Sequence, residues 1–88
     1  MMTNEQRIQE IRKRLTQALQ PTLLEVIDDS ADHYGHAGAQ SGAGHFTLRI
    51  TAPALNTLSK VAAHQRIYQH LQDLIPDEIH AISIQILK

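Results

Sequence analysis

Apolar residues near the start of the chain recur at helical spacing, at Ile8, Ile11, Leu15 and Leu19. Steps of three and four residues place such side chains on one face of an α-helix. Thr3 and Gln6 have the spacing of a capping box before this run, and Pro21 follows its end. The pattern predicts a helix from about Asn4 to Leu19. The outer face of this helix is expected to carry Arg7, Arg12 and Lys13.

Two segments after this helix have the pattern of β-strands. The run from Thr22 to Ile27 is short, apolar and partly β-branched. Further along, from Phe46 to Thr51, apolar and polar side chains alternate with the period of a half-buried strand. The segment between them is rich in glycine, alanine and serine and is longer than an ordinary hairpin connection. We therefore expect two neighbouring strands joined by a long loop.

A second long helix and a last strand are predicted in the C-terminal half. Steps of three and four residues indicate a helix from Ser59 to about Leu74. Its apolar stripe is expected to contain Val61, His64, Tyr68, Leu71 and Ile75. After a turn at Pro76-Asp77, isoleucines alternate with Ser83 and Gln85. This alternation predicts a strand whose polar side chains face away from the helices.

The predicted order of elements is helix, strand, strand, helix, strand. Each helix has one apolar stripe and the sheet has one apolar face, so burying them together places the helices on one side of the sheet. The last strand reaches its neighbour through a crossover. The sequence thus predicts a single α+β domain over residues 1–88, with the helices on one face of a three-stranded mixed sheet.

Charge and composition narrow the classes of function. Eight basic and nine acidic side chains give a formal net charge of -1, which supplies no overall positive field for nucleic acid. No apolar run approaches the roughly 18 residues of a membrane span, and we expect a soluble cytoplasmic protein. The chain contains no cysteine, which excludes disulfides and a self-sufficient iron-sulfur site. Any thiolate ligand must come from another molecule.

Histidines are the side chains most suited to chemistry in this sequence. His33 and His36 lie in the glycine-rich segment, and His80 opens the last apolar segment. Neutral imidazole binds zinc, copper and iron, so these three residues are the candidate metal ligands. His45 is expected to be structural at the entry of the second strand. His64 falls on the predicted helical stripe, where a half-buried histidine usually holds a structural hydrogen bond.

Other catalytic arrangements have little support, and we do not predict an enzyme. A run of carboxylates beside a turn, here Asp28, Asp29 and Asp32, is typical of a solvated loop. No phosphate-binding glycine motif follows a strand, and no nucleophile-histidine-carboxylate arrangement is indicated. The basic run at residues 12–14 is balanced by Glu5 and Glu10 on the same helix and predicts a solvated face.

Several motifs, taken in order, carry a resemblance to the BolA family over nearly the whole chain. They are Leu24-Glu25-Val26, Asp28-Asp29-Ser30, His33-Tyr34-Gly35-His36-Ala37-Gly38, His45-Phe46, His64 with Ile67-Tyr68, and His80-Ala81. The resemblance implies a fold like that of the type II KH domain. It also implies a short extra helix after the second strand, here at Pro53 to Leu58.

The same resemblance implies a function. BolA-like proteins are associated with monothiol glutaredoxins and glutathione, with which they are thought to hold a bridged 2Fe-2S cluster. In this chain the implied ligands are His80 with either His33 or His36, and the thiolates would come from the partner and glutathione. Some family members are described as transcriptional regulators, so DNA is the alternative partner. A third hypothesis is a simple zinc or copper protein that uses His33, His36 and His45.

Two departures from the family pattern weaken the DNA hypothesis. Leu55-Asn56-Thr57 stands where the family usually has Phe-x-Gly, and Ala63-His64-Gln65 stands where it has Arg-His-Arg. His64 and Arg66 are therefore only second-tier candidates for contacts with a partner or a nucleic acid. Residues 54–59 contain no glycine, whereas nucleic-acid-binding KH domains use a Gly-x-x-Gly loop. This absence argues against general RNA binding.

Overall fold

The computed structural model describes residues 2–30 and 42–88, so the candidate ligands His33 and His36 lie outside the described residues. The elements, in order, are α1 (Asn4–Leu19), β1 (Leu23–Asp28), β2 (Gly44–Thr51), α3 (Pro53–Asn56), α4 (Lys60–Leu71), the 3-10 helix η2 (Gln72–Leu74) and β3 (Ile79–Ile86). This order confirms the sequence prediction. The short extra helix is also present and ends two residues earlier than expected.

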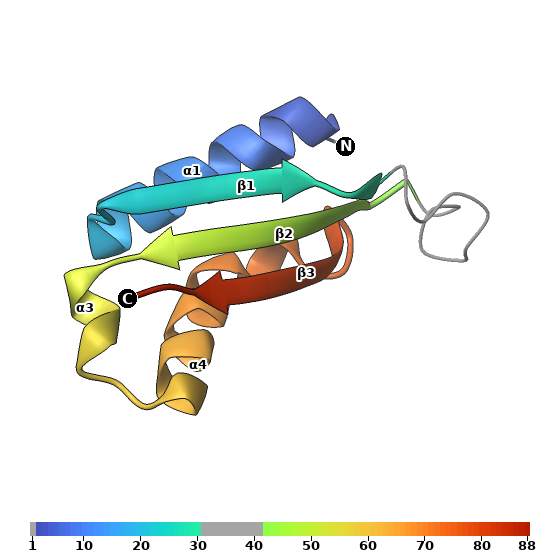
Figure 1. Cartoon of the computed structure of the whole chain (residues 1–88). Coiled ribbons are helices and arrows are strands. Elements are labelled where there is room, and N and C mark those ends of the chain that lie inside the picture. The colour runs from blue at the N-terminus through green and yellow to red at the C-terminus, as the bar shows by residue number, and fades with distance from the viewer. Residues whose placement is uncertain (1, 31–41) are drawn as a thin grey trace.

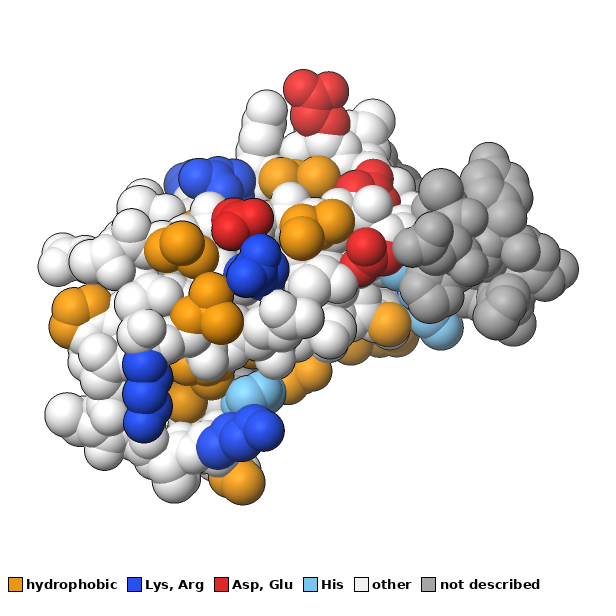
Figure 2. All heavy atoms as spheres, in the orientation of Figure 1, with side chains coloured by type: hydrophobic (Ala, Val, Ile, Leu, Met, Phe, Trp, Pro, Cys, Tyr) orange, Lys and Arg blue, Asp and Glu red, His pale blue; other side chains and the backbone are white. Residues whose placement is uncertain are grey.

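The sheet has the order β1-β2-β3, with β1 antiparallel to β2 and β2 parallel to β3. Helices α1 and α4 both lie on one face of this mixed sheet, as predicted, and no element of the described residues covers the other face, called the open face below (Figure 1). On the open face, apolar side chains are scattered among charged ones (Figure 2). A central ion pair there joins Arg49 of β2 to Glu25 of β1, with 3.7 Å between Nη1 and Oε1.

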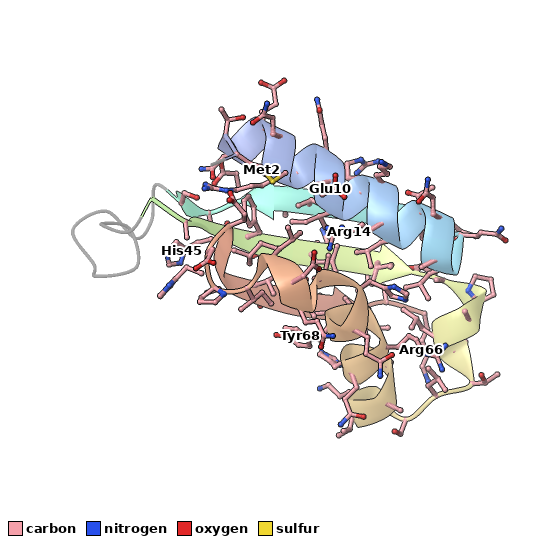
Figure 3. The ribbon with its side chains drawn as sticks, turned by 180° about the vertical axis from the view of Figure 1, so that it is seen from behind. Met2, Glu10, Arg14, His45, Arg66 and Tyr68 are labelled. Atoms are coloured by element: carbon pink, nitrogen blue, oxygen red, sulfur yellow. The ribbon has the colours of Figure 1, made fainter. Side chains whose placement is uncertain are left out.

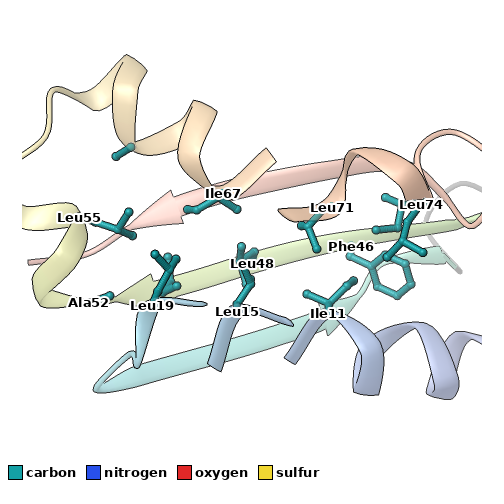
Figure 4. Packing of buried hydrophobic residues seen from close by; sticks show 13 residues of the cluster. Ile11, Leu15, Leu19, Phe46, Leu48, Ala52, Leu55, Ile67, Leu71 and Leu74 are labelled. Carbon is teal, nitrogen blue, oxygen red and sulfur yellow. The ribbon is translucent and has the colours of Figure 1, made fainter. Parts of the chain in front are cut away.

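The core lies between the covered face of the sheet and the two long helices (Figure 4). Its buried apolar members are Ile11, Leu15, Leu19, Phe46, Leu48, Ile50, Ala52, Leu55, Ala63, Ile67, Leu71, Leu74 and Ile79. From Phe46 on, every second residue of β2 belongs to this set, which explains the period-two pattern in the sequence. Among the helices of the described ranges, none is long and apolar enough to cross a membrane.

Local capping sets the start of α1 at the residue that the sequence predicts. The Gln6 N–H donates to Thr3 Oγ1 at 3.1 Å, and the Thr3 N–H donates to Gln6 Oε1 at 2.9 Å. These reciprocal bonds satisfy two donors that the first helical turn would otherwise leave unpaired. At the other end, Gln20 adopts a left-handed conformation with φ 48°, which ends the helix before Pro21.

The predicted apolar stripe of α4 is wrong in part, although Leu71 is buried and Ile75 packs against the core as expected. The helix buries Ala63, Ile67 and Leu71, whereas Val61 is 68% exposed and Tyr68 is 37% exposed. Residues 63, 67 and 71 also follow one another at four-residue steps, so periodicity alone did not distinguish the two faces. Ala63 is therefore at the centre of the buried face, while Tyr68 lies at its border.

Side chains from the helices reach the free backbone of both outer strands. The Leu87 N–H donates to Ile50 O, so alternate residues of β3 turn their backbone toward β2 and the others turn it away. Three side chains reach outward carbonyl oxygens of the edge strands. Arg12 Nη1 donates to Leu24 O at 2.8 Å and Tyr68 Oη donates to Ile82 O at 3.2 Å, while His64 Nε2 lies 3.3 Å from Ile84 O. The edges are therefore partly capped by the protein itself.

The expected outer face of α1 is also wrong in part. Arg7 is only 3% exposed and forms an ion pair with Glu78, with 3.0 Å between Nε and Oε1. Arg14 is not simply solvated: its Nε donates to Glu10 Oε2 at 2.8 Å, and its Nη2 donates to Asp73 Oδ2 at 3.0 Å. Both arginines form ion pairs with carboxylates that are distant in sequence. The helical pattern of the sequence does not predict such pairs.

The pair between Arg14 and Asp73 predicts an acid-dependent loss of stability. The hydrogen bond from Arg14 lowers the pKa of Asp73 below its ordinary value of 3.8. Since the pKa is lowered in the folded state, the stabilisation is present above the ordinary value and is lost as pH falls through the lowered one. We expect Asp73→Asn to lower the urea midpoint at neutral pH. The difference from the unmodified protein should vanish in strong acid.

Asp77→Asn is the matched control for this experiment, because Asp77 is exposed and forms no ion pair with any described residue. Its urea midpoint should follow that of the unmodified protein at both pH values. A difference for Asp73→Asn that persists unchanged in acid would contradict the role of the charge.

Candidate metal centre

The starts of β2 and β3 lie side by side because these strands are parallel. Gly44 pairs with Ile79, and the next pair joins His45 to Ala81, so His80 has no direct partner on β2. Such a β-bulge changes the direction of the extra side chain. The His80 ring lies against the His45 ring, with 5.0 Å between their centroids and 49° between their planes. The structure thus brings together a predicted ligand and a histidine that was expected to be structural and was named as a ligand only in the zinc or copper hypothesis.

The two imidazoles differ sharply in exposure. His45 is 4% exposed, whereas His80 is exposed at the surface. Figure 3 shows His45 at the end of the sheet where β2 begins. The pair therefore consists of one ring held inside the protein and one ring that a ligand or a partner can reach.

An open depression of about 390 Å³ adjoins this pair. It is lined by Asp29, His45, Phe46, Thr47, Ala81, Ile82 and Ser83. The Thr47 hydroxyl donates to the Asp29 carboxylate, so this acid is held in place and is not simply solvated. Imidazole nitrogen and carboxylate oxygen at one end of the sheet are donors suited to a borderline metal ion.

The described residues do not complete a metal site by themselves. Within residues 2–30 and 42–88, no group of three histidine, cysteine, aspartate or glutamate side chains is arranged to hold an ion. The segment that carries His33 and His36 begins and ends at this end of the sheet, since the Asp29 N–H donates to His45 O at 2.7 Å. The histidine and aspartate side chains of the described residues are therefore suited to a metal group that is also bound by further donors.

The second-tier candidates lie elsewhere. The His64 ring nitrogens are 2.8 and 3.3 Å from the backbone oxygens of Lys60 and Ile84. This confirms the interpretation of His64 as a half-buried histidine with structural hydrogen bonds. Ile84 is four residues beyond His80 on β3, so at about 3.3 Å per residue the two positions are about 13 Å apart along the strand. Arg66 is exposed on the same helix, α4 (Figure 3).

A basic groove occupies this second region, at the end of the sheet where β3 finishes. Its volume is about 500 Å³. The lining contains Leu55, Asn56, Leu58, Lys60, Ala63, His64, Ile84, Gln85, Ile86 and Lys88. Two lysines and no aspartate or glutamate side chain line an otherwise largely apolar surface, so the side chains of the groove favour an anionic ligand.

Comparisons with known proteins agree with this architecture. Residues 15–88 match the family described as BolA-like protein. SufE-like protein 1, chloroplastic/mitochondrial, from Arabidopsis thaliana is 43% identical over 79 residues, which cover 84% of this chain but 21% of that protein. The DNA-binding transcriptional regulator BolA of Vibrio cholerae is 34% identical over 74 residues, which cover 84% of this chain and 67% of that protein.

Solved structures show the same likeness. The BolA domain of SufE1 from Arabidopsis thaliana superimposes with a TM-score of 0.78 at 40% sequence identity. The match covers 91% of this chain and 88% of that domain. Since the present chain spans about a fifth of the whole SufE-like protein 1, the likeness concerns this domain and not the activity of the longer protein.

Proposed function

Because the chain belongs to the BolA-like protein family, we propose that it is an adaptor that holds a bridged 2Fe-2S cluster together with a monothiol glutaredoxin and glutathione. The observation that supports this most directly is the bulge that turns His80 out beside the buried His45. An exposed imidazole in a chain without cysteine is suited to a site completed by another molecule. The cluster is then the cargo of the complex.

Each part of the complex has a distinct role in this proposal. His80 is the ligand from the described part of the chain, and His33 or His36 is the second. The glutaredoxin cysteine and glutathione supply the thiolates, which a reducing cytoplasm keeps available. Replacing thiolate by histidine raises the reduction potential and makes ligation sensitive to protonation. These properties are suited to assembly, trafficking or iron sensing, in which the cluster must be released.

Loss of His80 is expected to disrupt the complex. A glutaredoxin homodimer carrying the cluster is titrated with the unmodified protein and followed by visible absorption and circular dichroism. A new spectrum should saturate at one-to-one stoichiometry. Changes in groups that merely orient a ligand cost about 10–100-fold in affinity, so His80→Ala should weaken the complex by at least about tenfold.

His70→Ala is the matched control, because it removes a histidine of α4 that lies outside the depression. Its titration should follow that of the unmodified protein. An unchanged spectrum with the unmodified protein would contradict the adaptor function for that glutaredoxin. Stoichiometric zinc binding by the protein alone, unaffected by His80→Ala, would indicate the simple metal-binding alternative.

The basic groove supports DNA binding as a second candidate function. Lys60 and Lys88 line it, and one relative is named a DNA-binding transcriptional regulator. Binding through phosphate contacts falls steeply as salt rises. A gel-shift assay at low salt tests this candidate, and unchanged DNA mobility would exclude it for the sequences used.

A further inference from the structure

We propose that Arg7 and Asn4 of α1 are positioning residues for the pair formed by His45 and His80. The proposal rests on the metal-binding function proposed above. A hydrogen-bonded relay formed by Glu78, Arg7, Asn4 and Ser30 reaches the start of both histidine-bearing strands. We call these four residues the α1 relay.

One end of the α1 relay holds the start of β3. Arg7 Nε donates to Glu78 Oε1 at 3.0 Å, and the Met2 N–H donates to the same oxygen at 3.0 Å. The Glu78 backbone is also held: its oxygen accepts from the Gly44 N–H at 3.0 Å, and its own N–H donates to Leu74 O at 2.8 Å. Glu78 stands two residues before His80, so these bonds set where the bulge begins.

The other end holds the start of β2. Arg7 Nη1 donates to Asn4 Oδ1 at 2.7 Å, and Asn4 Nδ2 donates to Ser30 Oγ at 3.1 Å. The His45 N–H donates to the same hydroxyl oxygen at 3.1 Å. A hydroxyl oxygen can accept two hydrogen bonds, so Ser30 links α1 directly to the backbone of His45.

The burial of Arg7 indicates that the relay serves geometry more than stability. The side chain is only 3% exposed, and its Nη2 has no hydrogen-bond partner among the described residues. Removing a guanidinium group from water costs free energy, and an incomplete set of hydrogen bonds does not fully offset that cost. Well-packed apolar side chains in the same place would stabilise the fold more. In some proteins, buried polar networks that are retained despite this cost fix one arrangement among several similar ones, and we infer that role for the α1 relay.

The backbone of β2 is also adapted to Asn4. A Cβ atom built on Gly44 would lie 2.9 Å from Asn4 Oδ1, closer than such atoms approach in proteins. The absence of a side chain at Gly44 therefore lets Asn4 lie against the strand, one residue before His45. With both strand starts tied to one helix, the bulge keeps the two imidazoles at a fixed separation.

Nuclear magnetic resonance of the protein without metal tests this role. Asn4→Ala and Ser30→Ala each interrupt the relay, and both should shift the ring-proton resonances of His45 and His80. Asn4→Asp is the conservative variant, because its carboxylate accepts from Arg7 and from the rotated Ser30 hydroxyl. The histidine signals of Asn4→Asp should match those of the unmodified protein. Gln9→Ala, on the exposed side of α1, is the control and should also leave the signals unchanged.

The cluster complex gives the second readout. Asn4→Ala and Ser30→Ala should each weaken it by about tenfold, the lower range for groups that orient a ligand. The double variant should lose no more than either single one, because both interrupt the same relay. Urea unfolding of each variant establishes that the fold is retained.

Unchanged histidine signals in both alanine variants would overturn the positioning role, and so would a loss of stability without any change at the histidines. The signals are measured on the protein alone, so they do not depend on glutaredoxin. Shifted signals without any cluster complex for the unmodified protein would therefore refute the adaptor function and leave the positioning of the pair intact.

Discussion

Leu48→Ala is expected to lower the free energy of unfolding by about 3 kcal/mol, within the range for large-to-small changes in a core. Leu48 is fully buried in the central strand and pairs with Val26 on one side and Ile84 on the other. Helices cover this face of the sheet, so the surroundings cannot collapse easily around the lost methyl groups. An 88-residue chain has a total stability of about 4–13 kcal/mol, which makes this a large fraction.

Urea unfolding followed by far-ultraviolet circular dichroism measures the change. Val61→Ala is the matched control, since Val61 is apolar but 68% exposed on α4. Exposed substitutions usually change stability by less than about 0.5 kcal/mol. An equal loss in the two variants would contradict the location of the core.

Gly44→Ala is expected to destabilise the protein by about 1–3 kcal/mol, the usual cost of overpacking a core. The added Cβ atom would overlap two carbon atoms of the Phe46 ring, which is itself buried. It would also lie 2.9 Å from Asn4 Oδ1 and so displace the α1 relay. The variant should therefore lose both stability, measured in urea, and affinity for the cluster complex.

A double variant separates the two causes. Phe46→Leu removes the ring that the new Cβ atom meets, so the stability losses of Gly44→Ala and Phe46→Leu should be less than additive. The cluster affinity should stay low in the double variant, because the contact with Asn4 persists. Fully additive stability losses would show that the ring is not what excludes a side chain at Gly44.

Local signals in the sequence predicted most of the fold. The capping box at Thr3, the proline at position 21 and the alternation in β2 all act between near neighbours, so the pattern located these elements closely. Local signals did not predict the burial of Arg7. It lies four residues before Ile11 on the buried face, yet its partner Glu78 is 71 residues away. A polar side chain on an apolar stripe cannot be assigned without knowing that partner.

The candidate site was predicted only in part for a similar reason. His80 was selected from the sequence, and the structure places it at an exposed bulge. The closeness of His45 depends on the parallel pairing of β2 and β3 and on a one-residue shift in their register. Both histidines open strands, which is the one signal in the sequence that could have paired them. The roles of His33 and His36 as ligands stay predictions.

The capped edges of the sheet have a consequence for the behaviour of the protein at high concentration. Unpaired strand edges are templates for intermolecular pairing and for amyloid growth. Here a guanidinium, a phenol and an imidazole already occupy outward carbonyl oxygens of β1 and β3. We therefore expect Arg12, Tyr68 and His64, three side chains outside the hydrophobic core, to hinder fibril growth at these edges.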